Sequence, residues 1–460
     1  MVGDNRGFAK GLFIATLIAA ALRFTHLGTV PVSLYCDEAF HGYEAQSLLT
    51  TGKDTRGVTL PFFFDIFGKG WGEPLYIYLT VPPVALFGLT AFACRFTAAL
   101  AGTLAVAATG LMTAALVPHG RRAGLSAAFL MAISPWSFHL SRVAFQASLL
   151  PLMLAAGFWL AARALRIDAP RGKQARALPL AAAAFVLGLS LYTYTISRLI
   201  LPLLLAGFVV SHRKALAGLA RPVLIALIVG ASLSAPIVAF TLTDQGRQRF
   251  LDVTVLSRSG DAGTGAGAVL AAIAGNHLSY YSPRFLVTDG DPNTRHSIRG
   301  HGVLHPHDFL LLILGAGICV AAPGPGALFL LWWLLAFPVG AALTIDPGHA
   351  VRAMCGQPAV YAVAGLGAAA VWNLATAATL GRIRAWLARG LLVLAAGVGA
   401  VSAAGYFRDY FVEYPVYSGP DWQYGLKEVY EYTDSVAAEH DSIYITPNED
   451  FPFIHYLFYR

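Results

Sequence analysis

The chain has 460 residues, of which 57% are hydrophobic and only 12% are charged. A soluble domain carries roughly 25% charged residues, so this composition excludes a cytosolic globular protein. It also excludes intrinsic disorder, which requires low hydrophobicity and high charge. The net charge of +7 does not indicate nucleic acid as a partner, because the basic residues cluster in short gaps between apolar segments. That placement is typical of membrane proteins. The sequence therefore predicts an integral membrane protein.

Eleven apolar segments are predicted to span the membrane, since a span requires about 20 mostly apolar residues. They lie at 10–27, 92–117, 123–138, 148–165, 178–195, 199–211, 222–242, 308–322, 327–344, 353–375 and 386–404. A further apolar segment, 74–90, contains Pro82 and Pro83, which we expect to interrupt a helix. We interpret that segment as a juxtamembrane or re-entrant piece. The predicted fold class is mainly α, a polytopic membrane protein with about eleven transmembrane helices.

Lysine and arginine set the predicted orientation. They occur in alternate gaps, for example at Arg121–Arg122 and Arg213–Lys214, and the positive-inside rule assigns those gaps to the cytoplasm. The opposite gaps are 28–91, 134–147, 192–198, 243–307, 345–352 and the tail from 405. Nearly every polar cluster lies in these outer gaps. We therefore expect a multi-pass protein of the cytoplasmic (inner) membrane whose chemistry faces outward.

Two domains are predicted. Residues 1–404 form a transmembrane catalytic domain with long outer loops at 28–91 and 243–307, the first of which holds juxtamembrane helices. Residues 405–460 form a short outer α/β segment. In that segment 421–440 is predicted as an amphipathic helix and 441–446 as a strand.

The most distinctive polar pair is Asp37–Glu38, directly after the first predicted span. Two adjacent carboxylates at a membrane boundary are costly unless they are solvated or used. One interpretation is a general base, because partial desolvation raises the pKa of a carboxylate toward neutrality. The other is structural, with Asp37 capping the helix that follows. The residues alone leave both interpretations open.

The first outer loop continues with KGWGEPLYIYL at 69–79. Lys69 and Glu73 are candidate ligand-binding residues in this segment. The aromatic residues beside them, Trp71, Tyr76 and Tyr78, suit the membrane interface, so anchoring is the favoured interpretation for them.

Two arginines, Arg142 and Arg198, lie beside hydroxyl side chains at the outer ends of predicted helices. The guanidinium fork of arginine binds phosphate well. The alternative for each is a side chain that reaches the lipid headgroups along its apolar stem.

Segment 290–308 of the outer loop is rich in basic residues, namely Arg295, His296, Arg299, His301, His305 and His307. Histidine is a common metal ligand, but the spacing matches no standard zinc pattern, and polar loop contacts or anion binding are favoured. Further along, His349 and Arg352 precede a predicted span. Arg352 lies at the helix start, where backbone N–H groups also favour an anion. No cofactor is predicted, and a divalent metal is left open.

The outer face thus offers one carboxylate pair and several separate cations. This polarity is expected for a substrate with an anionic leaving group, since a carboxylate deprotonates the nucleophile and cations stabilise the departing phosphate. The sequence contains no phosphate-binding GxxxxGK[ST] motif and no Rossmann glycine pattern.

Several segments resemble the membrane glycosyltransferases of the GT-C class. They are the acidic pair after the first span, GEPLYIYL, FGLTAFACRFTAALAGTL (87–104), SPWSFHLSR, TYTISRLILP, GDPNTRHS and DPGHAVRA. In order and common sidedness they are similar to a bacterial branch of the protein-mannosyltransferase superfamily, which includes the aminoarabinose transferase of lipid A. The resemblance covers most of 20–375. It implies inverting transfer of one sugar from a polyprenyl-phosphate carrier to a lipid, glycan or protein acceptor outside the membrane.

The resemblance also assigns roles. It implies that Asp37 is the base or acceptor-orienting carboxylate, with Glu38 as its partner, and that His41 occupies a position where the lipid A enzymes have a tyrosine. Two residues depart from the pattern: Glu73 replaces a lysine and Gln146 replaces an aspartate. The complete set of predicted substrate-binding residues is His41, Tyr43, Lys69, Glu73, Arg142, Gln146, Tyr194, Arg198, Arg295, His296, His349 and Arg352.

Two other functions are compatible with the composition. A transporter or flippase for a lipid-linked anion predicts charges near the middle of spans and paired broken helices. Here the charges lie at outer helix ends, which favours an enzyme. A non-catalytic scaffold for envelope assembly would leave Asp37 dispensable.

Overall fold

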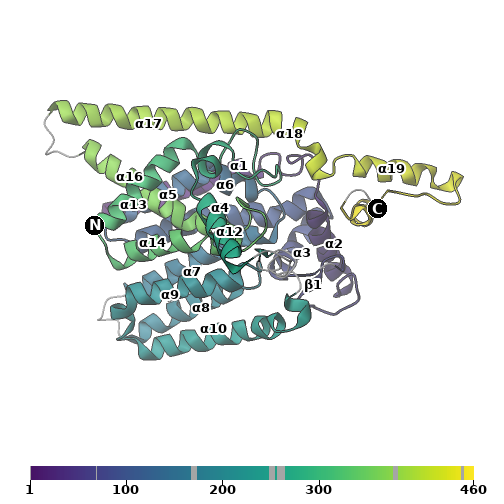
Figure 1. Ribbon diagram of the computed structural model, residues 1–460, viewed down its shortest axis with the longest axis horizontal. Coiled ribbons are helices and arrows are strands. Elements are labelled where there is room, and N and C mark those ends of the chain that lie inside the picture. Colours follow the sequence, from purple (N-terminus) through teal and green to yellow (C-terminus); the bar gives the residue numbers. More distant parts are fainter. Residues whose placement is uncertain are drawn as a thin grey trace.

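The computed structural model describes residues 2–68, 70–166, 173–247, 254–255, 265–376, 382–446 and 450–460. Within these ranges the protein is almost entirely helical, and its one sheet is a short hairpin. Strand β1 (Phe64–Asp65) pairs antiparallel with β2 (Trp71–Gly72). Figure 1 shows the long helices lying side by side, with the N-terminus at one end of the bundle and the C-terminal helices at the other. The predicted mainly α fold class is confirmed.

The long helices of the bundle coincide with the apolar segments. They are α1 (Val2–Phe24), α4 (Ala91–Leu116), α5 (Arg121–Ile133), α7 (Leu150–Leu165), α8 (Ala177–Ser190), α9 (Ser197–Leu216), α10 (Ala220–Thr241), α13 (Pro306–Ala321), α14 (Pro325–Ala336), α16 (Gln357–Thr376) and α17 (Arg382–Arg408). Each of the eleven predicted spans overlaps one of them. Among the described residues, seven helical stretches are long and apolar enough to cross a membrane. The protein is therefore a multi-pass membrane protein, and the count of eleven spans stays a prediction.

Shorter elements gather at the end of the bundle opposite the N-terminus, where α2, α3, β1 and the C-terminal helices lie in Figure 1. The short helices are α2 (Cys36–Thr51), α3 (Leu75–Phe87), α6 (Pro135–Leu140), α12 (Ala266–Ser279), α15 (Val339–Ala342), α18 (Tyr414–Tyr417), α19 (Leu426–Val436) and α20 (Pro452–Tyr459). Single 3₁₀ or π turns lie at Gln146–Leu149, Lys173–Arg176, Arg284–Thr288, Met354–Gly356, Asp409–Glu413, Gly419–Trp422 and Ala437–Glu439. The sequence did not predict α12 or α20.

Helix α3 corrects one prediction, because it runs without interruption through Pro82 and Pro83. A proline leaves the carbonyl four residues earlier without its helical donor. For Pro83 that carbonyl belongs to Leu79, and it accepts a hydrogen bond of 3.1 Å from the Thr97 hydroxyl. The neighbouring helix α4 therefore supplies the donor that the proline lacks.

The structure of the C-terminal tail corrects another prediction from the sequence. Helix α19 lies inside the predicted helix 421–440, but residues 441–446 form no strand. Tyr444 in that segment is 93% exposed, and no described strand lies beside the segment. A strand needs a partner, since even a two-stranded hairpin is only marginally stable by itself. The ordered end of the tail is instead α20, whose Ile454 and Phe458 are buried against α2 and α4.

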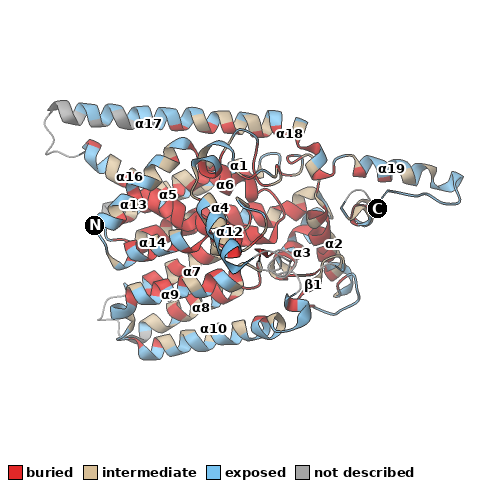
Figure 2. Ribbon diagram, viewed as in Figure 1, coloured by how far each residue is buried: buried red, intermediate tan, exposed pale blue. Residues whose placement is uncertain are grey.

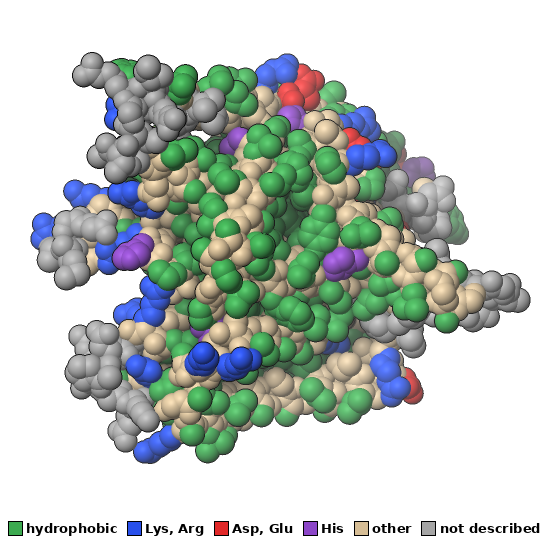
Figure 3. Space-filling model, turned by 60° about the vertical axis from the view of Figure 1, so that its left-hand side comes forward, with side chains coloured by type: hydrophobic (Ala, Val, Ile, Leu, Met, Phe, Trp, Pro, Cys, Tyr) green, Lys and Arg blue, Asp and Glu red, His purple; other side chains and the backbone are tan. Residues whose placement is uncertain are grey.

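Burial separates the central helices from the peripheral ones. Figure 2 shows buried residues concentrated in the middle of the bundle, while α10 and α17 are mostly exposed. The exposed side chains are apolar, for example Leu227 on α10 and Val401 on α17. Figure 3 shows the same property on one face, which is broadly hydrophobic with lysine and arginine side chains toward its margins. Such a surface suits contact with lipid acyl chains.

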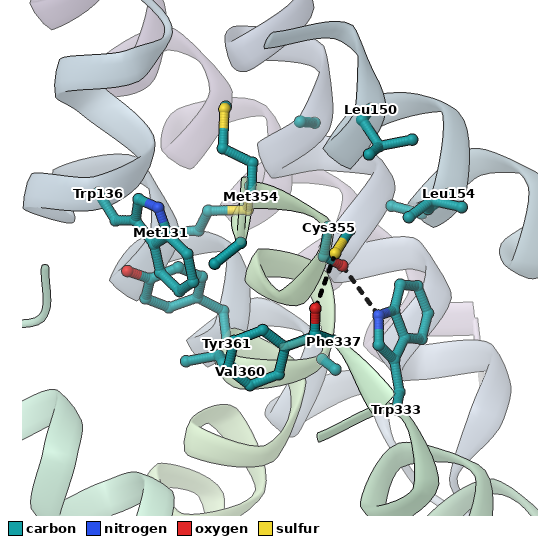
Figure 4. Close-up of a cluster of buried hydrophobic side chains, with 14 of the residues drawn as sticks. Met131, Trp136, Leu150, Leu154, Trp333, Phe337, Met354, Cys355, Val360 and Tyr361 are labelled. Atoms are coloured by element: carbon teal, nitrogen blue, oxygen red, sulfur yellow. Dashed lines mark hydrogen bonds between the residues drawn. The ribbon is translucent and has the colours of Figure 1, made fainter. Parts of the chain in front are cut away.

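A hydrogen-bonded core supports the loop that precedes α16. Figure 4 shows Trp333 of α14 and Cys355 within this cluster. The Trp333 indole N–H donates to the Cys355 carbonyl at 2.8 Å, and the Cys355 thiol contacts the Phe337 carbonyl at 3.4 Å. Both bonds are buried, so they are shielded from competition with water. They fix the turn that begins just after His349 and Arg352.

Candidate functional site

A polar cavity of about 310 Å³ opens at the end of the bundle opposite the N-terminus. Its wall combines the start of α2 with the 3₁₀ turn before α7, the loop after α8, the loop before α13 and the loop before α16. Eight of the fourteen predicted site residues line it: Asp37, His41, Gln146, Tyr194, Arg295, His296, His349 and Arg352. Segments up to 315 positions apart in the sequence thus meet in one site.

Asp37 lies in the first turn of α2 and faces the cavity half-buried. It does not cap the helix, because the N-cap residue is Tyr35. The side chain that returns to the N-cap backbone is that of Glu38, which accepts from the Tyr35 N–H at 3.1 Å. The structural interpretation of Asp37 is therefore wrong, and its carboxylate is available to a ligand in the cavity.

Glu38 points from α2 toward α4 and corrects a second prediction, since it does not line the cavity. It is completely buried and forms a two-pronged ion pair with Arg95 of α4, with both N–O distances at 2.9 Å. It also accepts from the Ala144 N–H at 2.8 Å. With these partners and the Tyr35 N–H its oxygens are fully occupied, so Glu38 positions α2 and has no capacity left for substrate.

Arg142 is another correction, because it is buried away from the cavity. Its guanidinium donates to the carbonyls of Leu22, Arg23, Thr25 and Val30 and to the Tyr410 hydroxyl, at 2.7–3.1 Å. Arg95 likewise donates to the carbonyls of Leu27, Pro31 and Ser33. The two arginines hold the connector from α1 to α2 and so orient the helix that carries Asp37.

His41 and Gln146 form a neutral pair beside Asp37 in the cavity wall. His41 Nδ1 lies 2.8 Å from the Ala144 carbonyl, which only accepts, so this nitrogen carries the proton. Its Nε2 then accepts from the Gln146 amide at 3.0 Å. The resemblance implied a tyrosine at the position of His41 and an aspartate at the position of Gln146. In this chain the two residues bond to each other and present neutral hydrogen-bonding groups there.

A second cavity of about 300 Å³ adjoins the first, and both are lined by Tyr194 and Arg352. The surface of its wall is mostly apolar, with Leu199 and Leu343 among the lining residues, and it also carries Arg198 and Arg247. The polar cavity therefore continues into an apolar one that carries arginines.

Glu73 holds one of these arginines in place. Its carboxylate is buried and accepts from Arg198 at 2.9 Å and from the Thr195 hydroxyl at 2.6 Å. Glu73 itself lines neither cavity. The predicted direct contact with substrate is replaced by a positioning role.

Two arginines enter the polar cavity from separate loops. Arg295 lies over the Tyr35 ring, 4.1 Å from its centroid, and donates to the Asp421 carbonyl at 3.1 Å. Arg352 donates to the Thr344 hydroxyl at 2.8 Å and to Asp346 at 3.0 Å. Both guanidinium groups retain donors beyond these contacts, since each has five N–H bonds.

Asp291 joins the loop before α13 to the loop before α16. Its Oδ2 accepts from the Ala350 N–H at 2.7 Å and lies 2.9 Å from His296 Nδ1. Burial acts to raise the pKa of Asp291, but the hydrogen bond and charge of His296 outweigh it and the pKa is lowered. Burial, aided by the charges of His296 and Arg352, lowers the pKa of His349 to about 2, so this imidazole is neutral at physiological pH.

The remaining predicted residues lie elsewhere. Tyr43 is half-buried and packs against the hydrophobic cluster behind α2, and Lys69 lies outside the described residues. Tyr76 is no interfacial anchor, because it is completely buried and donates to the Cys94 carbonyl at 2.7 Å. Sequence reasoning missed Arg95 and Asp291. Arg95 gave one usable signal, since an arginine inside a predicted span requires an anionic partner.

No family model matches the chain, and no curated protein does. Solved structures do match. The apo oligosaccharyltransferase of Archaeoglobus fulgidus aligns with a TM-score of 0.60 and 15% identity, covering 98% of this chain and 63% of that one. ArnT from Cupriavidus metallidurans bound to undecaprenyl phosphate aligns with a TM-score of 0.56 and 14% identity, covering 97% and 84%.

These likenesses extend over nearly the whole chain, although it spans less than two thirds of the length of the oligosaccharyltransferase it matches. At such identities they concern the arrangement of the helices and not individual residues. Both matched proteins are membrane glycosyltransferases of the GT-C class, the class that the sequence motifs resemble. The chain therefore has the GT-C fold.

Proposed function

We propose that the protein is a glycosyltransferase that moves a sugar from a polyprenyl-phosphate donor to an acceptor on the outer face of the cytoplasmic membrane. The observation that carries this proposal is the pair of adjoining cavities, one polar beside Asp37 and one apolar beside Arg198. A lipid-linked sugar has the same division, with a polar ring, a phosphate and a long apolar chain. Arg352 lines both cavities and thus borders the place expected for the phosphate.

The matched structures support a lipid-linked donor. ArnT was solved with undecaprenyl phosphate, and the Archaeoglobus oligosaccharyltransferase with dolichol-phosphate and an inhibitory peptide. Each of those ligands joins a phosphate to an isoprenoid chain. The proposed donor belongs to the same chemical class, and the transferred sugar is a hexose or a pentose.

In the proposed reaction Asp37 is the general base. An acceptor hydroxyl in the polar cavity gives its proton to the carboxylate as its oxygen forms a bond to the anomeric carbon. The bond from that carbon to the phosphate oxygen breaks, and its electron pair leaves with the lipid phosphate. Arg352 and Arg198 stabilise the negative charge on the departing group. Attack opposite the leaving group inverts the anomeric configuration.

The test is sugar transfer by the purified full chain, offered labelled hexose and pentose derivatives of undecaprenyl phosphate together with membrane acceptors. We expect Asp37→Asn to lower kcat by roughly 10²- to 10⁴-fold, the usual contribution of a positioned general base. Its thermal unfolding should match that of the wild type. Asp434→Asn is the matched control, because this carboxylate lies on exposed α19 and is 4.0 Å from Arg460. It should transfer at the wild-type rate.

Two outcomes would contradict the proposal. Equal transfer by Asp37→Asn and the wild type would remove the base assignment. Failure of the wild type to transfer any of these sugars, combined with movement of the intact lipid-linked sugar across vesicles, would favour the transporter instead.

A further inference from the structure

Three potential metal ligands from two loops converge at the wall of the polar cavity. Asp291 and His296 come from the loop before α13, and His349 comes from the loop before α16. One ligand atom from each lies within 4.8 Å of the other two. We propose that these three residues bind a divalent transition-metal cation, with Zn²⁺ as the best match.

The distances suit a shared cation. Asp291 Oδ2 lies 2.9 Å from His296 Nδ1 and 3.8 Å from His349 Nδ1. Two ligands bound at about 2.0–2.2 Å to a tetrahedral Zn²⁺ are roughly 3.3 Å apart. The two observed distances lie on either side of that value, and all three ligand atoms lie within 4.8 Å of one another. No pair of ligand atoms therefore has to close by more than about 1.5 Å to reach the separation found around Zn²⁺.

The donor set selects the kind of cation. Two imidazoles and one carboxylate occur together in catalytic zinc sites. Imidazole nitrogen favours zinc and its neighbours, whereas Ca²⁺ and Mg²⁺ prefer sites built from oxygen alone. Three protein ligands leave a fourth tetrahedral position for water or substrate, and two of them, His296 and His349, line the polar cavity.

Surrounding hydrogen bonds hold the ligands in place. Asp291 Oδ1 accepts from the Asn293 N–H at 2.9 Å, and Oδ2 accepts from the Ala350 N–H at 2.7 Å. The His349 N–H donates to the Tyr280 hydroxyl at 3.0 Å. Such outer contacts are typical of metal sites, where they orient the ligands. A cation bound at His296 Nδ1 would take the place of the proton that this nitrogen shares with Asp291.

A hydrogen-bonded pair alone explains Asp291 and His296 but not His349. The His349 ring lies beside that of His296, with centroids 4.4 Å apart, and its Nδ1 is too far from the carboxylate for a hydrogen bond. Its polar contact at Nδ1 is a long one of 3.5 Å from the Arg352 N–H. A shared cation gives this nitrogen a strong partner.

The cation also has a use in the cavity. His296 and His349 line the same cavity as Asp37 and Arg352, so a cation held by them would be within reach of a phosphate oxygen of the donor. This use rests on the proposed function, whereas cation binding itself does not.

The experiment measures metal content. Purified full chain in detergent is stripped with EDTA, loaded with Zn²⁺, freed of excess and analysed by inductively coupled plasma mass spectrometry. Wild type should hold about one equivalent, and His349→Gln and His296→Gln should bind at least roughly 10-fold more weakly, since even outer contacts change affinity by that factor. Co²⁺ should give the visible absorption of a tetrahedral site only in the wild type.

His301→Gln is the matched control, because His301 lies in the same loop but bonds to Asp409 at 2.8 Å. It should retain the wild-type metal content. Equal metal content in wild type and His349→Gln, when both unfold at the same temperature, would overturn the site.

Parallel transfer assays separate the two proposals. Sugar transfer by wild type that binds no cation would overturn the metal site and leave the transferase intact. One equivalent of cation in a protein that transfers no sugar would support the metal site and contradict the transferase.

Discussion

Carboxylates and arginines occur both in the polar cavity and in the buried wall behind it. In the cavity they remain able to bind a ligand, whereas in the wall they bind only other groups of the protein. Asp37 and Arg352 lie in the cavity, partly exposed and with bonding capacity to spare. Glu38 and Arg95 lie in the wall, completely buried and bonded on every side. Asp37 and Glu38 are neighbours in the chain, so position on the helix alone decides their roles.

The difference teaches that a charge in a membrane protein is not by itself evidence of catalysis. A buried charge is tolerated when its partners satisfy it fully. Arg142 illustrates this, because carbonyl groups and one hydroxyl occupy its donors. Such a group stabilises the packing of the helices. Only the groups that still have free hydrogen-bond donors or acceptors can bind a ligand.

The largest change in stability is expected for a substitution in the buried wall, at the ion pair between Glu38 and Arg95. Arg95→Leu leaves Glu38 charged and unpaired in the interior, which costs about 3–5 kcal/mol of stability. Thermal unfolding in detergent measures the loss, with Asp37→Asn as the control on the neighbouring residue. The double variant Glu38→Leu/Arg95→Leu should recover part of the stability, because no unpaired charge remains. An Arg95→Leu protein as stable as Asp37→Asn would break the contrast.

A smaller effect is expected where wall and cavity meet. Glu73→Gln removes the charged partner of Arg198, whose other side-chain hydrogen bond is a long one of 3.3 Å to the Thr241 hydroxyl. Loss of a hydrogen bond to a charged group is worth about 1.5–3 kcal/mol, and the amide oxygen of glutamine recovers part of it. We expect KM for the lipid-linked donor to rise about 5- to 10-fold with kcat nearly unchanged. A fall in kcat at constant KM would instead place Glu73 in the chemistry.

The smallest effect is expected at Tyr43, which the sequence placed in the substrate set and the structure places against the hydrophobic cluster behind α2. Tyr43→Phe keeps the ring and its packing, and surface changes of this kind stay within about 0.5 kcal/mol. Transfer and unfolding temperature should both match those of the wild type. A loss of transfer greater than about 10-fold would return the hydroxyl to the site.

Hydropathy was sufficient to place the long helices, because each span must be apolar over its length. Local sequence was insufficient for α3, where the helix continues through its prolines because the Thr97 hydroxyl of another helix donates the hydrogen bond that Pro83 cannot. Polar residues just beyond the predicted spans were a sound guide to the cavity, since Asp37, Arg295 and Arg352 all line it.

The sequence could not predict which charged residues pair with each other. Glu38 and Arg95 are 57 positions apart and meet only because α2 packs on α4. Asp291 lies in the segment GDPNTRHS, but its meeting with His349 depends on how two loops fold together. Charge spacing along the chain carries no information about such contacts, which arise from the packing of the whole bundle.

The contact between α2 and the C-terminal tail sets an order of assembly. The Cys36 N–H donates to Gln423, 387 positions later, and Gln423 donates in turn to the Asp450 carbonyl. At about 5–20 residues per second, those 387 positions take roughly 20–80 s to synthesise. During that interval the helix bearing Asp37 is already made but lacks part of its frame. A nascent chain therefore has the Asp37 carboxylate before it has the tail contacts that complete the position of α2.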